Sequence, residues 1–329
     1  MLALLCPRVR LPGCAGFFLI LQYVSRFFIL LVVSFLWGDS DMVPESEKRI
    51  VQFDPVLQIE AYRFQGVQQK FPNHFHPYYV IGLIESGERR LFCQQMEWII
   101  RPGDLLLFQP LMNHACESVD NQPLDYRCLN IKTDVITYTA RMLDLPILPG
   151  KMLSFPQPVV LQAPEETVNT LRKLHQMIMS PCEGEEILRE EQYLLLMEQV
   201  LTQYIGETTS EVLEKGGVVQ ACTYLEGHFG ERVTLEELSS LAGMGKYRLI
   251  REFAREKGIT PYRYLEAVRV NAAKRLLEEG IPPAEAAVST GFSDQSHFSN
   301  AFKAQIGLTP KQFQKIFKDF IPGHQKERT

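Results

Sequence analysis

Three histidines in the first half of the chain have side chains that could do chemistry. His74 and His76 are separated by a single residue, and His114 lies further along the chain. Side chains two apart on a strand point to the same face, so these two imidazoles could converge with a third from a later strand. Such a set could hold a zinc ion. It could equally line a small-molecule pocket, or only bond to nearby backbone groups.

The residues around the histidines favour the pocket over the metal site. The pattern resembles the cupin barrel, whose metal-binding members use His-x-His, a Glu a few residues on, and a later His. Here Val80 and Ile81 occupy the positions of that Glu, and the nearest carboxylate is Glu85. Polar side chains in a barrel mouth serve ligand binding at least as well. We therefore predict no metal, no cofactor and four ligand-binding residues: His74, His76, Tyr78 and His114.

The elements that must position these side chains are short strands. Between Ile50 and Ile136, brief apolar runs rich in β-branched and aromatic residues are cut by Gly, Pro and Asn. Many short strands at near-regular spacing predict a sandwich or barrel. The Arg-Pro-Gly-Asp sequence at 101–104 is typical of the turn between two of them. We predict strands at 78–84, 90–93, 98–100, 105–108 and 126–131.

Two amphipathic helices are predicted after the strands. Residues 165–179 and 185–205 each place apolar side chains on one helical face. The second helix is apolar over a wide arc, which can face the core or a second subunit. Residues 206–217 are polar and end in paired glycines, a composition that indicates a linker.

The last third of the chain contains two helix-turn-helix patterns. In the first, a helix at 218–228 precedes Thr234 and Glu237, which have the spacing of a capping box. The capping box opens a short helix, and glycines at 243 and 245 separate this helix from another one at 246–257. In the second pattern, a long helix at 261–277 precedes a short helix at 282–288 and a further helix at 294–305. Basic and amide side chains on the outer faces of these helices suit an acidic, grooved partner.

The C-terminal motifs resemble one family of DNA-binding domains. The sequences Gly-Ile-Thr-Pro at 258–261, Ala-Ala at 272–273, Gly-Phe-Ser-Asp-Gln-Ser-His-Phe-Ser-Asn-Ala-Phe-Lys at 291–303 and Gly-Leu-Thr-Pro at 307–310 resemble the AraC/XylS-type domain nearly position for position. The resemblance covers about a hundred residues, and the N-terminal histidine pattern resembles, more loosely, the cupin-like sensor domain commonly fused to it. Two independent resemblances in the expected order support each other.

The resemblance implies that two helix-turn-helix units enter successive major grooves on one face of the DNA. Arg251 is expected to pair with guanine, and Gln295 or Asn300 with adenine. Lys274 is expected, like Arg255 and Lys303, to contact phosphates. The full set of implied DNA-binding residues is Lys246, Tyr247, Ile250, Arg251 and Arg255 in the first unit, and Gln295, Ser296, His297, Asn300 and Lys303 in the second.

The predicted fold class is α+β with two domains. It comprises an N-terminal cupin-like β-barrel followed by helices, and a C-terminal all-α domain whose two helix-turn-helix units are joined by a long helix. We predict a sensor barrel at 42–160, a helical dimerisation or connector region at 161–205, a linker at 206–217 and an AraC-type DNA-binding domain at 218–320.

The composition agrees with a two-domain regulator. Residues 216–329 carry 16 basic and 13 acidic side chains, a net charge of +3, on a chain whose overall charge is −5. A hydrophobic content of 46% excludes a largely disordered chain, and seven scattered cysteines without CxxC spacing indicate free thiols in a reducing compartment.

We predict a cytoplasmic, homodimeric, sequence-specific transcriptional regulator that is not an enzyme. A small molecule in the barrel modulates it, and its partners are double-stranded DNA, this effector and RNA polymerase. Two alternatives stay open: a cupin-type metal-dependent dioxygenase or isomerase, and a membrane-anchored regulator.

The N-terminal segment is unlike the rest of the chain. Residues 17–37 form an apolar run of 21 residues, long enough to span a bilayer, and residues 1–38 contain no Asp, Glu or Lys. Met42 opens a polar sequence suited to the start of a soluble chain. We expect residues 1–41 to be a mis-assigned or dispensable start and a membrane role to be absent; a real anchor or signal peptide is the alternative.

Overall fold

The computed structural model describes residues 47–145, 152–206 and 216–318. The apolar N-terminal segment and most of the predicted linker lie outside these residues. Within the described part of the chain, no helix is both long enough and apolar enough to cross a membrane. The described cysteines are free thiols, as the sequence predicts.

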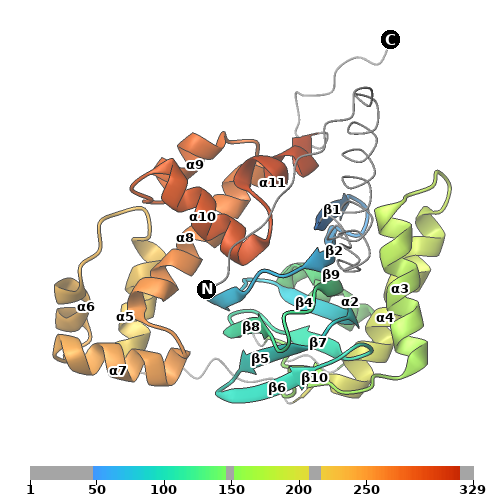
Figure 1. The fold of residues 1–329 in the computed structure, drawn as a ribbon, viewed down its shortest axis with the longest axis horizontal. Helices are drawn as coiled ribbons and strands as arrows, with labels where there is room; N and C mark the ends of the chain where they lie inside the picture. Colours follow the sequence, from blue (N-terminus) through green and yellow to red (C-terminus); the bar gives the residue numbers. More distant parts are fainter. Residues whose placement is uncertain (1–46, 146–151, 207–215, 319–329) are drawn as a thin grey trace, which may run out of the picture. The chain divides into compact units, whose positions relative to one another are not determined.

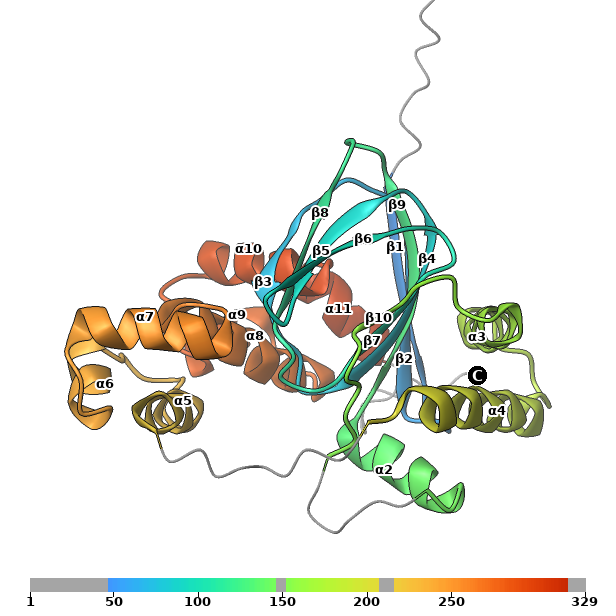
Figure 2. The same ribbon diagram turned by 90° about the horizontal axis from the view of Figure 1, so that it is seen from below.

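The first described region is built from antiparallel strands in two sheets (Figures 1 and 2). Among the described residues, one sheet has six strands, in the order β1 (Lys48–Asp54), β2 (Ile59–Val67), β9 (Leu124–Ile131), β4 (Tyr79–Ser86), β7 (Leu105–Phe108) and β10 (Val159–Val160). The other has four, in the order β3 (Phe71–His74), β8 (His114–Ser118), β5 (Arg89–Cys93) and β6 (Met96–Ile100). The pairing of the described strands leaves two sheets and does not close one continuous barrel.

Alternation along β4 explains why this strand is apolar from Tyr79 to Ile84, before it ends in Glu85 and Ser86. Val80 and Ile84 belong to the core between the sheets, whereas Tyr79, Ile81 and Leu83 belong to a second core on the opposite face. Side chains alternate between the two faces of a strand, so a strand buried on both faces needs apolar residues at every position. The strand-rich prediction for this region is confirmed.

Helices cover the second of these cores. The helices α2 (Thr133–Met142), α3 (Glu165–Met179) and α4 (Glu186–Tyr204) follow or interrupt the strands. Helices α3 and α4 lie side by side, and α3 contacts β1, β2 and β9 (Figure 2). The sequence predicts α3 and α4 closely, but α2 is an additional element.

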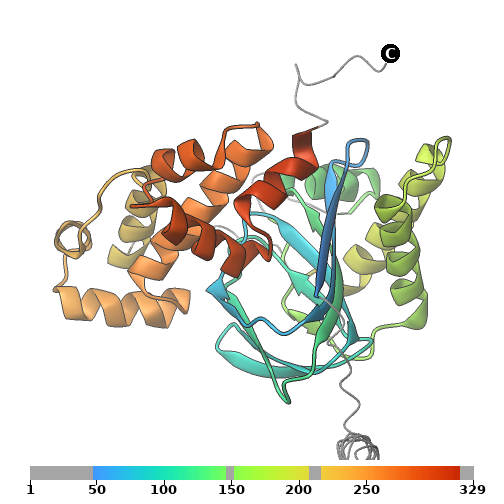
Figure 3. The same cartoon turned by 45° about the horizontal axis from the view of Figure 1, so that its top comes forward.

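The last described region is all helical (orange to red in Figures 1 and 3). Its described helices are α5 (Gly217–Gly227), α6 (Leu235–Leu241), α7 (Lys246–Lys257), α8 (Pro261–Glu278), α9 (Pro283–Ser289), α10 (Gln295–Ile306) and α11 (Pro310–Phe317). Helices α6 and α7 form the first helix-turn-helix unit, α9 and α10 form the second, and the long helix α8 joins them. The predicted fold class is confirmed, and α11 is an additional helix.

Local chemistry fixes the ends of these helices. Thr234 and Glu237 form the predicted capping box at the start of α6. Helices α7 and α10 end at Gly258 and Gly307, whose φ angles are 73° and 85°. Only glycine adopts this left-handed conformation without strain, so each glycine sets the length of the helix before it.

Candidate functional site

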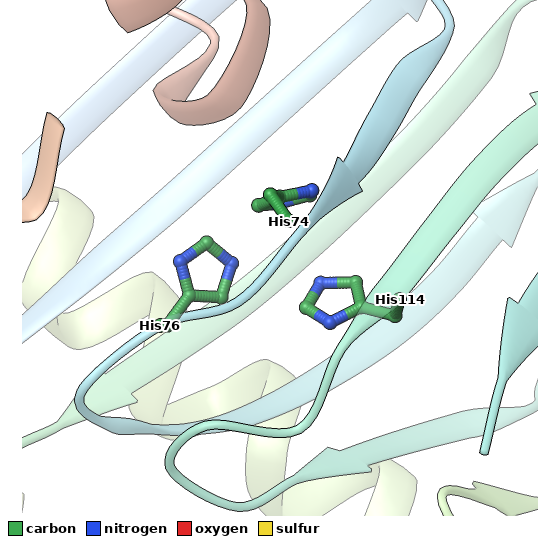
Figure 4. A group of neighbouring side chains, drawn as sticks. All are labelled: His74, His76 and His114. Carbon is green, nitrogen blue, oxygen red and sulfur yellow. The ribbon is translucent and has the colours of Figure 1, made fainter. Parts of the chain in front are cut away.

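The three histidines of the N-terminal region lie together (Figure 4). The ring centroid of His74 is 4.7 Å from that of His76 and 4.5 Å from that of His114. One ring nitrogen from each of the three lies within 4.8 Å of the other two. The sequence predicts that His74 and His76 converge because they share one face of a strand. This is only partly right, because β3 ends at His74 and His76 lies in the segment that follows. The convergence arises from this segment and from the start of β8, not from one strand face.

Hydrogen bonds orient the three rings. The Nδ1 atoms of His74 and His114 lie 2.6 and 2.9 Å from the carbonyl oxygens of Pro72 and Met112. A carbonyl only accepts, so each Nδ1 carries the proton and each Nε2 keeps its lone pair. Nδ1 of His76 lies 3.1 Å from the Tyr78 hydroxyl.

Burial keeps the imidazoles neutral. Loss of solvent lowers the pKa of His74 to about 4 and that of His114 to about 3. Burial, followed by the repulsion that His74 and His114 exert when protonated and that Lys274 exerts, also lowers the pKa of His76 well below its usual value. At neutral pH the cluster therefore offers nitrogen lone pairs and no positive charge.

A cavity of about 100 Å³ adjoins the cluster. All four residues predicted to bind a ligand line it: His74, His76, Tyr78 and His114. Tyr62, Asn130 and Gln305 also line it and were missed, because nothing in the sequence relates β2, β9 and the end of α10 to the histidines. Their roles in binding stay predictions.

A second cavity, of about 530 Å³, lies between strand residues and helices α5 and α8. Lys274 lines this cavity and is only 5% exposed, so its predicted phosphate contact is wrong. Its Nζ lies 2.8 Å from Oε2 of Glu60 and 4.2 Å from the centroid of the Tyr78 ring. Burial opposes the charged form, but the Glu60 carboxylate outweighs it and raises the pKa of Lys274. The lysine is therefore a buried cation that joins α8 to β2.

The outer face of α7 carries the residues predicted for the first unit. Leu249 and Phe253 are buried beneath it. Tyr247 is 79% exposed, and Ile250 is 37% exposed. The five residues implied by the resemblance are all exposed: Lys246, Tyr247, Ile250, Arg251 and Arg255.

The outer face of α10 carries those predicted for the second unit. Four are exposed: Gln295, Ser296, Asn300 and Lys303. The fifth, His297, is half-buried and turned toward α8, with Nε2 3.3 Å from a Glu266 carboxylate oxygen and 3.4 Å from the Tyr262 hydroxyl. His297 thus has fewer atoms free for an outside partner than its neighbours.

Both regions of the chain match families of known proteins. A family model described as an AraC-like ligand binding domain matches residues 56–197, and one described as a helix-turn-helix domain matches residues 238–316. The chain is similar to YbfI of Bacillus subtilis, an uncharacterized HTH-type transcriptional regulator, with 48% identity over 276 residues that cover 83% of this chain and 98% of that protein.

Weaker similarities also extend over most of the chain. The HTH-type transcriptional activator RhaS of Escherichia coli is 26% identical over 269 residues, which cover 77% of this chain and 91% of that protein. The fold is similar to a crystal structure of a variant of apo ToxT from Vibrio cholerae, with a TM-score of 0.50 and 13% identity over 81% of this chain and 99% of that one.

Proposed function

The chain belongs to the AraC/XylS family of transcriptional regulators, and from that premise we propose how it acts. It binds specific operator DNA through α7 and α10, and a small effector in the cavity beside the histidine cluster changes this binding. The observation that carries the proposal is that two helices, joined by one rigid helix, both expose polar faces over apolar anchors.

The two exposed faces suit the two kinds of DNA contact. Arg251 has the fork of donors that pairs with guanine O6 and N7, and the amides of Gln295 and Asn300 match adenine N6 and N7. Arg255 and Lys303 are placed to contact phosphates, which fix the register of a protein on DNA without reading sequence. Lys246, Tyr247, Ile250 and Ser296 complete the proposed surface, and His297 contributes at its edge.

The effector site is proposed at four residues that line the smaller cavity: His74, His76, Tyr78 and His114. Gln305 and Ile306, at the end of α10, line the same cavity. An effector there touches the helix that carries the proposed base-reading residues, which links binding in the cavity to binding of DNA. We propose that the protein regulates transcription and has no enzymatic activity.

The proposed partners follow from this role. A second copy of the chain is expected on α4, whose Ile187, Leu188 and Leu195 are 73%, 38% and 38% exposed. Exposed apolar side chains gathered on one helix suit an interface with another subunit. A regulator of this kind acts with RNA polymerase and in the cytoplasm, where it reaches double-stranded DNA.

Fluorescence anisotropy tests the proposed function directly. The full chain is titrated onto labelled DNA from its own upstream region and onto a scrambled duplex, at two salt concentrations. We expect specific binding at least roughly 1,000-fold tighter than binding to the scrambled duplex, and affinities that fall steeply with salt. Equal affinities for the two duplexes would contradict a role in sequence-specific regulation, provided that genome-wide selection also recovers no preferred sequence.

A further inference from the structure

Although the missing glutamate predicts no metal here, we propose from the observed geometry that His74, His76 and His114 bind one divalent first-row transition metal ion, with zinc as the representative ion. The regulatory part of this inference, that the ion acts as the effector or holds it, rests on the function proposed above. Among the residues that the structure describes, these three are the one group of His, Cys, Asp or Glu side chains close enough to share a metal ion.

The orientation of the rings supports a metal site. Metal-binding histidines usually donate their second ring N–H to a carbonyl or carboxylate, which fixes the ring and leaves the other nitrogen free for the metal. His74 and His114 do this with the carbonyls of Pro72 and Met112. Among the described residues, no protein group bonds to Nε2 of any of the three histidines.

The spacing of the nitrogens is compatible with an ion. Bonds of about 2.0–2.1 Å place the nitrogens of a tetrahedral zinc site about 3.3 Å apart. The three ring nitrogens here lie within 4.8 Å of one another, so they need to approach by at most about 1.5 Å to share one ion.

The donor set selects the class of metal. Imidazole nitrogen suits zinc, cobalt, nickel and copper, whereas magnesium and calcium need oxygen ligands. The nearest carboxylate along the chain, Glu85, is already paired with Arg127 at 2.5 Å and Arg172 at 2.6 Å. Three neutral nitrogens therefore form the site, with one coordination position left open to the cavity.

The size of the cavity distinguishes a metal ion from a larger organic effector. Pockets for drug-sized molecules usually measure roughly 300–1,000 Å³. The cavity beside the histidines measures about 100 Å³. That volume suits an ion with a water or another ligand of a few atoms on its open position.

Contacts from the site and from the segment beside it reach helices α8 and α10 of the DNA-binding domain. Tyr78 meets His76 through its hydroxyl and Lys274 of α8 through its ring. On the other side, Nε2 of Gln69, on the segment that leads into β3, lies 3.3 and 3.2 Å from the carbonyl oxygens of Lys303 and Ala304 in α10. An ion that moves His76 or His74 therefore acts on contacts of both α8 and α10.

The test begins with metal binding to the full chain without DNA. The chain is stripped of metal with a chelator and titrated with Zn²⁺ in a calorimeter and with Co²⁺ in an absorption spectrometer. We expect one ion per chain and cobalt bands in the visible range of the kind given by a four-coordinate nitrogen site. His76→Gln and His114→Gln should each weaken zinc binding at least roughly 100-fold, beyond the 10–100-fold seen for lost supporting contacts.

The control is His228→Gln, which removes the histidine that follows the last residue of α5, contacts Tyr224 and lies outside the cluster. It should bind zinc like the unmodified chain. Circular dichroism shows whether each variant is folded, and the cobalt spectrum of the unmodified chain needs no variant. Zinc binding that survives in the His74, His76, His114 triple Gln variant, or no binding of either ion by the unmodified chain, would overturn the site.

A second measurement separates the site from its regulatory role. Anisotropy on operator DNA with and without Zn²⁺ should show a change of at least roughly fivefold in affinity, the lower end of typical coupling. A Glu60→Gln, Lys274→Met double variant removes both buried charges together, and should bind zinc but lose this change.

The outcomes of this measurement differ for the two proposals. Zinc binding with no effect on operator affinity overturns the ion as effector. Specific DNA binding without any metal binding overturns this inference and leaves the proposed function intact. Metal binding without sequence-specific DNA binding overturns the proposed function and leaves the metal site intact.

Discussion

Helices α7 and α10 are anchored in the same way but present different chemistry on their exposed faces. Each has 12 residues and ends at a glycine with positive φ. Leu249 and Phe253 anchor α7, as Phe298 and Phe302 anchor α10, and all four are fully buried. On its exposed face, α7 carries four cationic side chains: Lys246, Arg248, Arg251 and Arg255. The exposed face of α10 carries mainly amides and a hydroxyl: Gln295, Asn300 and Ser296.

The difference suggests a division of labour within one DNA-binding domain. Cationic side chains are attracted to phosphates anywhere on DNA and release counterions when they bind. Amides carry no charge but match the donor and acceptor pattern of adenine. We therefore expect the first unit to supply more of the salt-dependent affinity, and the second to supply more of the sequence preference.

The largest effects should show that the two anchors are equivalent. Phe253→Ala and Phe298→Ala each remove a fully buried ring. Each should lower the free energy of unfolding by about 3–5 kcal/mol, from lost burial and the cavity left behind. Urea denaturation, followed by circular dichroism, measures both values. Exposed Tyr247→Ala on α7 is the control and should change stability little; a cost below about 1 kcal/mol for one Phe variant alone would break the equivalence of the two anchors.

The next effects should show how the exposed faces differ. Arg251→Ala and Gln295→Ala should each weaken binding to the operator by about 1–3 kcal/mol and relax the preference at one base pair. Arg255→Ala should lower the slope of log affinity against log salt by about 1, because it removes a proposed phosphate contact, whereas Gln295→Ala should not. Anisotropy over a range of salt concentrations measures both quantities.

Matched variants on the other domain control for charge and side-chain type. Arg141→Ala on α2 and Gln203→Ala on α4 change exposed residues far along the chain from α7 and α10. Neither should alter operator affinity. If Gln295→Ala weakens operator and scrambled DNA equally, it does not read a base, and the proposed division between the two units is wrong.

Much of the fold was accessible from local signals in the sequence. Alternation, capping residues and glycines located five of the ten described strands and most of the described helices, because these elements depend on neighbours in the chain. Helix α2 was missed, since the sequence after β9 has no clear cap; its N-cap, Lys132, makes no side-chain capping bond. The pairing of strands into two sheets was also not predicted, because strand order depends on contacts between residues far apart in the sequence.

The site was predictable only in part, for a related reason. Three histidines could be selected by type, but their meeting depends on the segment after β3 rather than on strand periodicity. Lys274 shows the opposite error. Its position on a basic helix predicts a solvent-exposed side chain. Instead, it forms a buried ion pair with Glu60, which comes more than two hundred positions earlier in the chain. No pattern within a single element reveals such a partner.

The smallest effect concerns how the two helices begin. The Asp294 side chain accepts a hydrogen bond from the backbone N–H of His297 at the start of α10, at 2.7 Å, whereas Gly245 gives α7 no side-chain cap. Hydrogen bonds to the charged form, first of all from the His297 backbone, lower the pKa of Asp294. Asp294→Ala should therefore reduce stability at neutral pH by removing a preferred capping residue.

The pH dependence identifies the cause of that loss. Because the folded-state pKa of Asp294 is depressed, the cap stabilises fully above the usual aspartate value of about 3.9, and this contribution is lost as pH falls through the lower folded pKa. The melting temperatures of the unmodified and Asp294→Ala chains should thus converge as the solution is acidified. The melting temperatures of Asp294→Asn and Asp294→Ala should differ by nearly the same amount at every pH, because neither residue titrates. Conversely, Gly245→Asp should stabilise α7 at neutral pH by supplying the cap it lacks. A constant gap between the unmodified and Asp294→Ala chains at every pH would mean that the carboxylate charge is not what distinguishes the start of α10 from that of α7.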